Sequence, residues 1–153
     1  MAGVELTLSL PDLDRLGAQL MSIDSVIPDA LPGLSVLVES QTRRRIADEK
    51  ESPDGEPWAA WSPAYAKTRR GGQSLLIGRG DFLDSIAGDV IGNDTISVGS
   101  DKVQAALMQF GGDDSMVPGP AAVPARPYLG LSDANLDEVS DFLSLVITEH
   151  VND

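Results

Sequence analysis

The chain of 153 residues lacks several residue types on which common functions depend. It has no cysteine, which excludes disulfide frameworks, thiol nucleophiles and thiolate metal or iron–sulfur sites. Its single histidine, His150, excludes a two-histidine zinc site and argues against a Ser–His–Asp triad. The best apolar stretch, residues 34–38, is far shorter than the ~20 residues of a membrane span. With no basic region before an apolar run at the N-terminus, we expect neither membrane contact nor a secretory signal.

Signatures of catalysis and of nucleotide binding are also missing. The glycines of residues 71–80 are not followed by Gly-Lys-Ser/Thr and do not have the G-x-G-x-x-G spacing. The acidic pairs Asp12/Asp14 and Asp113/Asp114 do not belong to a D-x-D-x-D-G calcium loop. Carboxylates are numerous, but nothing singles out a catalytic pair. We therefore predict a protein that is not an enzyme, with no catalytic residue, no cofactor and no metal site.

Basic residues are scarce and unevenly distributed. Eleven Lys and Arg against 24 Asp and Glu give a net charge of −13, which argues against a surface that grips nucleic-acid phosphates throughout. Residues 43–79 nevertheless carry +3, whereas residues 1–42 carry −5 and residues 80–153 carry −11. This polarity fits head-to-tail contact between copies of the chain, and it equally fits a chance clustering of solvated charges. An alternative function is a nucleic-acid-binding module that uses the basic 43–70 segment.

The N-terminal third predicts one strand and two helices. Apolar residues alternate with polar ones over residues 4–10, which is the pattern of a half-buried strand. Apolar residues then recur at three- and four-residue spacing over 12–27, and a second helix is predicted over 34–51. The residues Pro28 to Gly33 separate the two, so we expect an antiparallel helix pair with a short connection.

The rest of the chain predicts shorter elements joined by loops rich in proline and glycine. These elements are a helix over 82–86 capped by Asp81, a hairpin over 89–99 with a two-residue Asn93-Asp94 turn, a helix over 102–110, and a C-terminal helix capped by Ser132. Extended loops are expected over 52–74 and 112–128. The prediction is a single α+β domain over 1–153, in which a small antiparallel sheet packs against several helices.

Two side chains outside these elements allow alternative readings. Trp58, in the proline-rich loop, either caps the core as a lid or contributes to a partner-binding patch, and half-buried tryptophan favours the lid. Arg126 precedes Pro127 on a rigid extended segment. It either forms a salt bridge or backbone clamp to the acidic arm of a neighbouring subunit, or forms a bridge within its own subunit.

A series of motifs runs through residues 34–150. Residues 52–58 read S-P-D-G-E-P-W, residues 109–112 read Q-F-G-G, and residues 125–132 read A-R-P-Y-L-G-L-S before an acidic terminal helix. This order resembles the phage virion morphogenesis, or tail completion, family of Mu-like and P2-like tailed bacteriophages.

The resemblance implies a structural, non-enzymatic protein of the head–tail connector (neck) or of tail completion. Such a protein would assemble in the host bacterial cytoplasm and remain in the neck or tail of the virion. Its expected partners are copies of itself in a ring, taken as hexameric, and neighbouring proteins such as a head-completion (stopper) protein, a tail terminator or the tail tube. Viral DNA would pass through the lumen without specific binding, since acidic walls repel phosphates. The expected interface residues are Trp61, Arg69, Arg70, Arg79, Met116, Val117, Arg126 and Tyr128.

Overall fold

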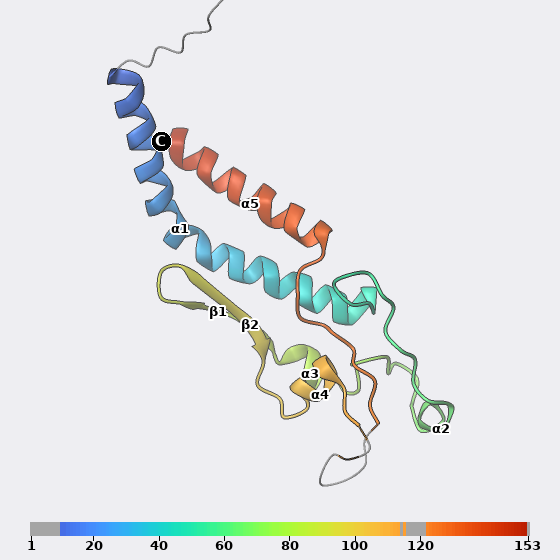
Figure 1. Cartoon of the computed structure of the whole chain (residues 1–153). Coiled ribbons are helices and arrows are strands. Elements are labelled where there is room, and N and C mark those ends of the chain that lie inside the picture. The colour runs from blue at the N-terminus through green and yellow to red at the C-terminus, as the bar shows by residue number, and fades with distance from the viewer. Residues whose placement is uncertain (1–9, 114, 116–121, 153) are drawn as a thin grey trace, which may run out of the picture.

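A long N-terminal helix organises the computed structural model, which describes residues 10–113, 115 and 122–152, with side chains from residue 25 onward (Figure 1). Helix α1 spans Leu10–Arg44 and continues directly into a π-helical turn, η1, over Arg45–Glu49. Lys50 ends it in the left-handed conformation, with φ of 57°. Among all the described residues, no helix is long and apolar enough to cross a membrane.

Two prolines lie inside α1 instead of ending it. Pro28 and Pro32 are both helical, so the predicted pair of helices over 12–27 and 34–51 was wrong, because these segments belong to one helix. A proline inside a helix removes one backbone donor and bends the axis, and the blue and cyan parts of α1 run in different directions in Figure 1. The predicted strand over 4–10 lies outside the described residues except for Leu10, where α1 begins.

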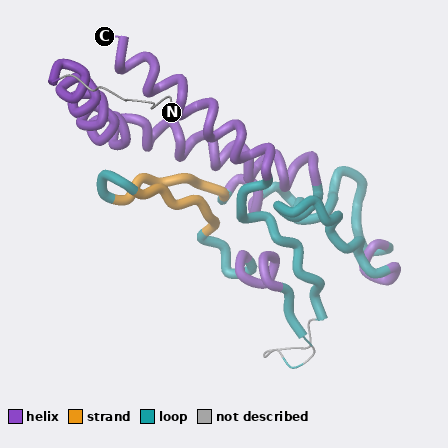
Figure 2. The backbone as a smooth tube through the Cα atoms, turned by 45° about the horizontal axis from the view of Figure 1, so that its top comes forward, coloured by secondary structure: helices purple, strands orange, loops and turns teal. Residues whose placement is uncertain are grey.

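The C-terminal helix α5, Asp133–Asn152, packs antiparallel along the second half of α1 (Figure 2). Three contacts set the register: Ser25 with His150 at 3.4 Å, Gly33 with the Phe142 ring, and Gln41 with the Asn135 carbonyl at 3.2 Å. The predicted cap is confirmed, because the Asn135 amide donates to Ser132 Oγ at 3.1 Å and the Ser132 amide donates to Asn135 Oδ1 at 3.1 Å. The packing of α5 against α1 stabilises α1 although its two prolines cannot donate backbone hydrogen bonds.

A β-hairpin contacts α1 on another side, so α1 runs between the hairpin and α5 (Figure 1). Strand β1, Ile86–Ile91, pairs antiparallel with β2, Thr95–Ser100, and they form a two-stranded sheet in the described chain. The hairpin and the α+β class are confirmed. The turn is longer than predicted, because it spans residues 92–94 and uses the positive φ of Gly92, 67°.

Close approach of β1 to α1 depends on a glycine. A Cβ atom on Gly88 would lie 2.5 Å from Ser35 Oγ and 2.9 Å from the Ser35 carbonyl oxygen. The Gly88 amide donates to Glu39 Oε2 at 2.9 Å, and Arg43 Nη2 donates to the Ile86 carbonyl at 2.6 Å. The hairpin is therefore held to α1 by side chains of the helix.

Three short helices complete the described fold. They are α2 over Pro63–Ala66, α3 over Asp81–Asp84 and α4 over Ala105–Phe110. The predicted helices over 82–86 and 102–110 are present with shifted ends, but Asp81 is not a cap: it is the first helical residue, and Gly80, at φ of 96°, precedes it. The core below α1 consists of Ile46, Trp58, Phe82, Ile86 and Tyr128, with the Phe82 and Tyr128 rings edge-to-face at 5.1 Å.

Candidate interface site

Three consecutive arginines, where α1 continues into η1, bind three different parts of the same chain. Arg43 reaches the hairpin, as described above, and pairs with Glu39 at 2.9 Å. Arg44 donates from Nη2 to both carboxylate oxygens of Glu138 on α5, at 3.0 and 3.3 Å. Arg45 reaches the segment that leads into α5. Much of the predicted positive patch is thus used to hold the fold together.

Arg45 is the most buried of these cations, with 1% of its surface exposed. Its Nη1 donates to the carbonyls of Tyr128 at 3.3 Å and Gly130 at 2.6 Å, and its Nη2 donates to Asn135 Oδ1 at 2.6 Å. Burial lowers the pKa of Arg45, yet a guanidinium remains charged. Arg45 therefore ties the A-R-P-Y-L-G-L-S motif to the end of α1.

Trp58 and Arg126 hold the proline-rich loop against the same motif. Trp58, 6% exposed, donates from Nε1 to the Pro127 carbonyl at 3.0 Å, which confirms the lid. Arg126, also 6% exposed, donates from Nε to the Ala59 carbonyl at 2.9 Å and from Nη2 to the Ala60 carbonyl at 3.3 Å. Burial lowers the pKa of Arg126. Its hydrogen bonds lie within one subunit, so the structure favours the internal reading, with carbonyls as the acceptors.

Lys50 holds a second part of the loop region, at Ser74 and Leu75, in place. Its Nζ donates to the Ile46 carbonyl, to Ser74 Oγ at 3.0 Å and to the Leu75 carbonyl at 2.8 Å. Desolvation lowers the pKa of this ammonium group. Ser74 and Ile77 close a tight turn through two backbone hydrogen bonds of 2.9 Å, and Leu76 inside it has a φ of 59°. A leucine in the left-handed region indicates local backbone strain, and the hydrogen bonds from Lys50 stabilise this turn.

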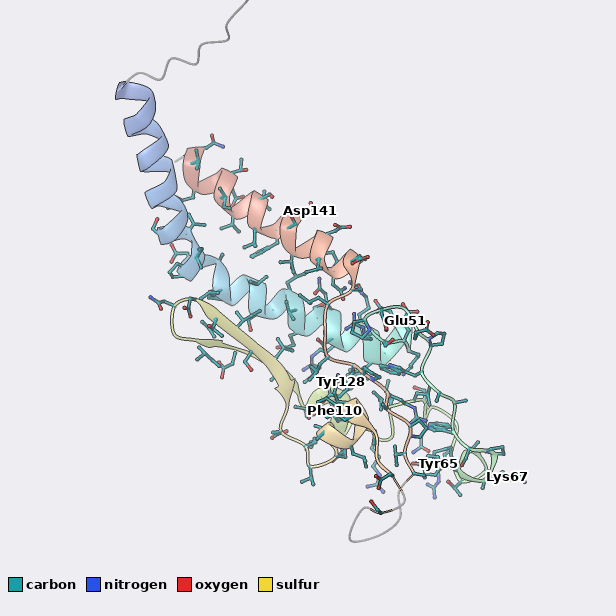
Figure 3. All side chains as sticks on the ribbon, in the orientation of Figure 1. Glu51, Tyr65, Lys67, Phe110, Tyr128 and Asp141 are labelled. Carbon is teal, nitrogen blue, oxygen red and sulfur yellow. The ribbon has the colours of Figure 1, made fainter. Side chains whose placement is uncertain are left out.

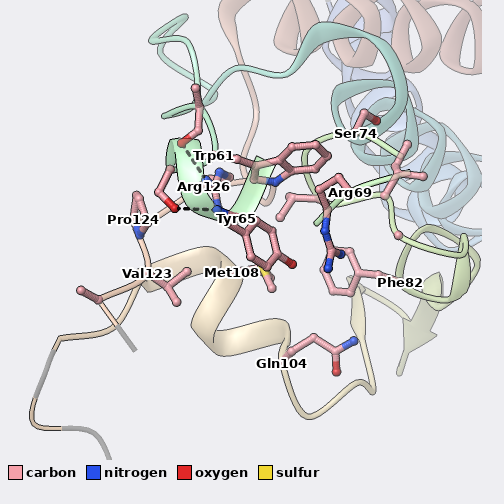
Figure 4. A pocket seen from close by; sticks show the side chains of 16 residues that line it. Trp61, Tyr65, Arg69, Ser74, Phe82, Gln104, Met108, Val123, Pro124 and Arg126 are labelled. Carbon is pink, nitrogen blue, oxygen red and sulfur yellow. Dashed lines mark hydrogen bonds between the residues drawn. The ribbon is translucent and has the colours of Figure 1, made fainter. Parts of the chain in front are cut away.

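A pocket of about 600 Å³ lies between this loop, α3, α4 and the segment 122–126 (Figure 4). Trp61 and Tyr65 pack edge-to-face at 5.9 Å, and the Arg69 guanidinium lies over the Tyr65 ring at 4.2 Å. Arg126 also lines the pocket, and no Asp or Glu is among the described lining residues. The site therefore combines apolar surface with positive charge, a composition that accepts an apolar group flanked by carboxylates.

Comparison with known protein families shows to which family the chain is related. Residues 29–147 match the model of the phage virion morphogenesis family. The chain belongs to that family. It is also 37% identical over 134 residues to the putative capsid assembly protein G of Escherichia phage Mu, which covers 84% of this chain and 81% of that protein. No solved structure matches significantly. The family resemblance inferred from the motifs is confirmed, and membership gives the chain a structural role in building a phage particle.

The structure places the predicted interface residues of this family member in different surroundings. Trp61, Arg69 and Arg126 come together at the pocket. Arg70 and Arg79 are exposed, and their side chains have no ion pair or hydrogen bond among the described residues. Tyr128 was predicted as a contact residue, but it is 1% exposed and its ring is packed in the core. Met116 and Val117 lie outside the described residues.

Sequence reasoning missed four of the side chains that shape the pocket. These are Tyr65, Leu76, Phe82 and Met108. For Tyr65 a signal was present, because it lies four residues after Trp61 and four before Arg69, the spacing at which side chains meet on a helical turn. The described residues hold no group of three His, Cys, Asp or Glu that could bind a metal ion.

Proposed function

We propose that this protein is a subunit of the head–tail connector or tail-completion complex and acts as a ring of identical subunits around the DNA channel. The observation that supports an assembly role is an imbalance in apolar burial. Among the described side chains, eight hydrophobic residues are buried, whereas ten large hydrophobic residues are exposed. A chain with so few buried apolar groups gains further burial by contact with neighbours.

The exposed apolar residues are distributed over separate parts of the surface. Val103 is 98% exposed just before α4, and Phe110 is 79% exposed at the end of α4. Val36 is 67% exposed on α1, and Leu145 is 58% exposed on α5. A subunit with apolar contacts on different faces can bind one neighbour on each side, which is the geometry of a cyclic assembly. The name of the Mu relative, putative capsid assembly protein G, is in keeping with such a role.

The charge distribution supports the channel proposal over the nucleic-acid-binding alternative. Of the eight bases in residues 43–79, Arg43, Arg44, Arg45 and Lys50 donate hydrogen bonds to distant parts of the chain. Half of these cations are therefore already bound within the chain, and the net charge of −13 opposes the approach of phosphates. An acidic ring would let DNA pass without adhesion.

A phage that lacks the gene tests the junction role. We expect filled heads and finished tails that fail to join in electron micrographs, with joining restored by the intact gene supplied in trans. Missing heads would contradict the proposal. For the alternative function, no DNA binding by the purified protein at low salt would remove it, whereas tight binding that is lost at physiological salt would favour it.

A further inference from the structure

The exposed flank of α5 carries an apolar residue between acidic ones. Asp137, Asp141, Leu145 and Glu149 follow one another at four-residue spacing and are all exposed. Residues at this spacing form a ridge on a helix surface, with about 6 Å between successive positions along the axis. Leu145 thus projects from the ridge with a carboxylate one turn before it and one turn after it. Helix α5 contains no Lys or Arg.

The pocket carries the opposite charge and an apolar floor. Residues 57–80 include the bases Lys67, Arg69, Arg70 and Arg79 and contain no acid. Leu76, Phe82 and Met108 contribute apolar surface to the pocket. Arg126 Nη1 has no hydrogen-bond partner among the described residues, since Nε and Nη2 make its two bonds. The pocket is therefore complementary in charge and polarity to the ridge on α5.

We propose that the pocket of one subunit receives Leu145 of a second copy, with Asp141 and Glu149 of that copy facing the bases that line the pocket, Arg69 and Arg126. In Figure 3, Asp141 lies on α5 beside α1, whereas Tyr65 and Lys67 lie in space at the opposite end of the molecule. The ridge and the pocket of one chain thus lie apart, and the contact joins two copies. Such a contact is heterologous and closes a ring when its rotation permits. This inference rests on the proposed assembly of identical subunits.

Cysteine crosslinking tests the contact directly, because the native chain has no cysteine. The double variant Ala60→Cys/Leu145→Cys places one thiol at the pocket and one on the ridge. We expect a ladder of covalent multimers on non-reducing gels after mild oxidation, and only dimers from a mixture of the two single variants. The control Ile91→Cys/Leu145→Cys, with a thiol on the exposed end of β1, should give no ladder.

Charge reversal provides a second measurement that does not depend on thiols. We expect Asp141→Arg and Arg69→Asp each to weaken self-association about tenfold in sedimentation equilibrium, and the combined variant to recover most of the loss. The control Asp94→Arg, in the hairpin turn, should associate as the native chain does. Circular dichroism spectra that match the native one would show that each variant is folded.

The outcomes separate this contact from the junction role. Rings that persist with no crosslink between residues 60 and 145, in solution or in particles, would overturn the contact and leave the junction role intact. Variants that block head–tail joining without changing self-association would assign the pocket to another virion protein, which also overturns the contact. A protein that stays monomeric in solution and in particles would overturn the contact. Normal infection by a phage that lacks the gene would overturn the junction role as well.

Discussion

The two halves of the basic segment carry the same number of bases but lie in different environments. Four bases lie at residues 43–50, here called the clamp: Arg43, Arg44, Arg45 and Lys50. Four more lie at residues 67–79, here called the open bases: Lys67, Arg69, Arg70 and Arg79. Each cation of the clamp donates to distant parts of the chain. The open bases have no ion pair among the described residues, and Arg69 contacts the Tyr65 ring instead.

This difference shows that net charge along a sequence does not by itself identify an interface. The clamp lies where α1 ends, so carbonyls and carboxylates from the hairpin, the loop and α5 all come within reach of its side chains. Of the open bases, Arg69 lines the pocket, and Lys67, Arg70 and Arg79 are exposed. The clamp is therefore expected to determine stability, and the open bases to determine association.

Loss of the buried clamp arginine is expected to give the largest effect. Arg45→Ala would leave the carbonyls of Tyr128 and Gly130 without this donor, and Asn135 Oδ1 would keep only the Ser132 amide. Because each buried unsatisfied acceptor is unfavourable by about 1–3 kcal/mol, we expect the free energy of unfolding to fall by about 3 kcal/mol or more. Urea unfolding followed by circular dichroism measures this. Arg70→Ala is the matched control and should change it by less than about 0.5 kcal/mol. Equal effects of the two substitutions would abolish the distinction between clamp and open bases.

Substitution of Gly88, the glycine of β1 that faces α1, should give the next largest effect. Gly88→Ala would force β1 away from Ser35 and disturb the bonds of Glu39 and Arg43 to the hairpin. We expect a loss of about 2 kcal/mol, as for other overpacked sites. Gly99→Ala is the control in the neighbouring strand, because nothing lies within 4 Å of the added methyl group. A Gly99 variant as unstable as the Gly88 variant would contradict this account.

Acid should weaken the contact between the clamp and α5. A hydrogen bond from Gln41, followed by the hydrogen bonds and charge of Arg44, lowers the pKa of Glu138 below its ordinary value of 4.5. Because the folded pKa is depressed, the stabilisation is present above pH 4.5 and is lost as pH falls through the folded value. The urea midpoint of the native chain should therefore exceed that of Glu138→Gln at pH 7, and the difference should shrink as the pH falls below 4.5. A difference that is independent of pH would contradict this assignment.

Sequence patterns predicted the elements whose local signals agree with their packing. The capped C-terminal helix and the hairpin belong to this group, since Ser132 and the alternation of residues 95–98 act locally. The break at Pro28 was wrong because tertiary contacts with α5 outweigh the local preference of proline. The burial of Tyr128 was missed because its ring packs against Phe82 and other core residues that lie far away in the sequence. Such long-range partners have no local signal.

The most direct test of the account compares folding and particle assembly in one variant. Arg69→Glu/Arg79→Glu reverses two open bases and leaves every clamp residue in place. The account predicts a urea unfolding midpoint close to that of the native chain. It also predicts that this variant, supplied to a phage that lacks the gene, leaves filled heads and finished tails unjoined. A normal yield of joined, infectious particles from the folded variant would contradict the central claim that the open bases serve assembly.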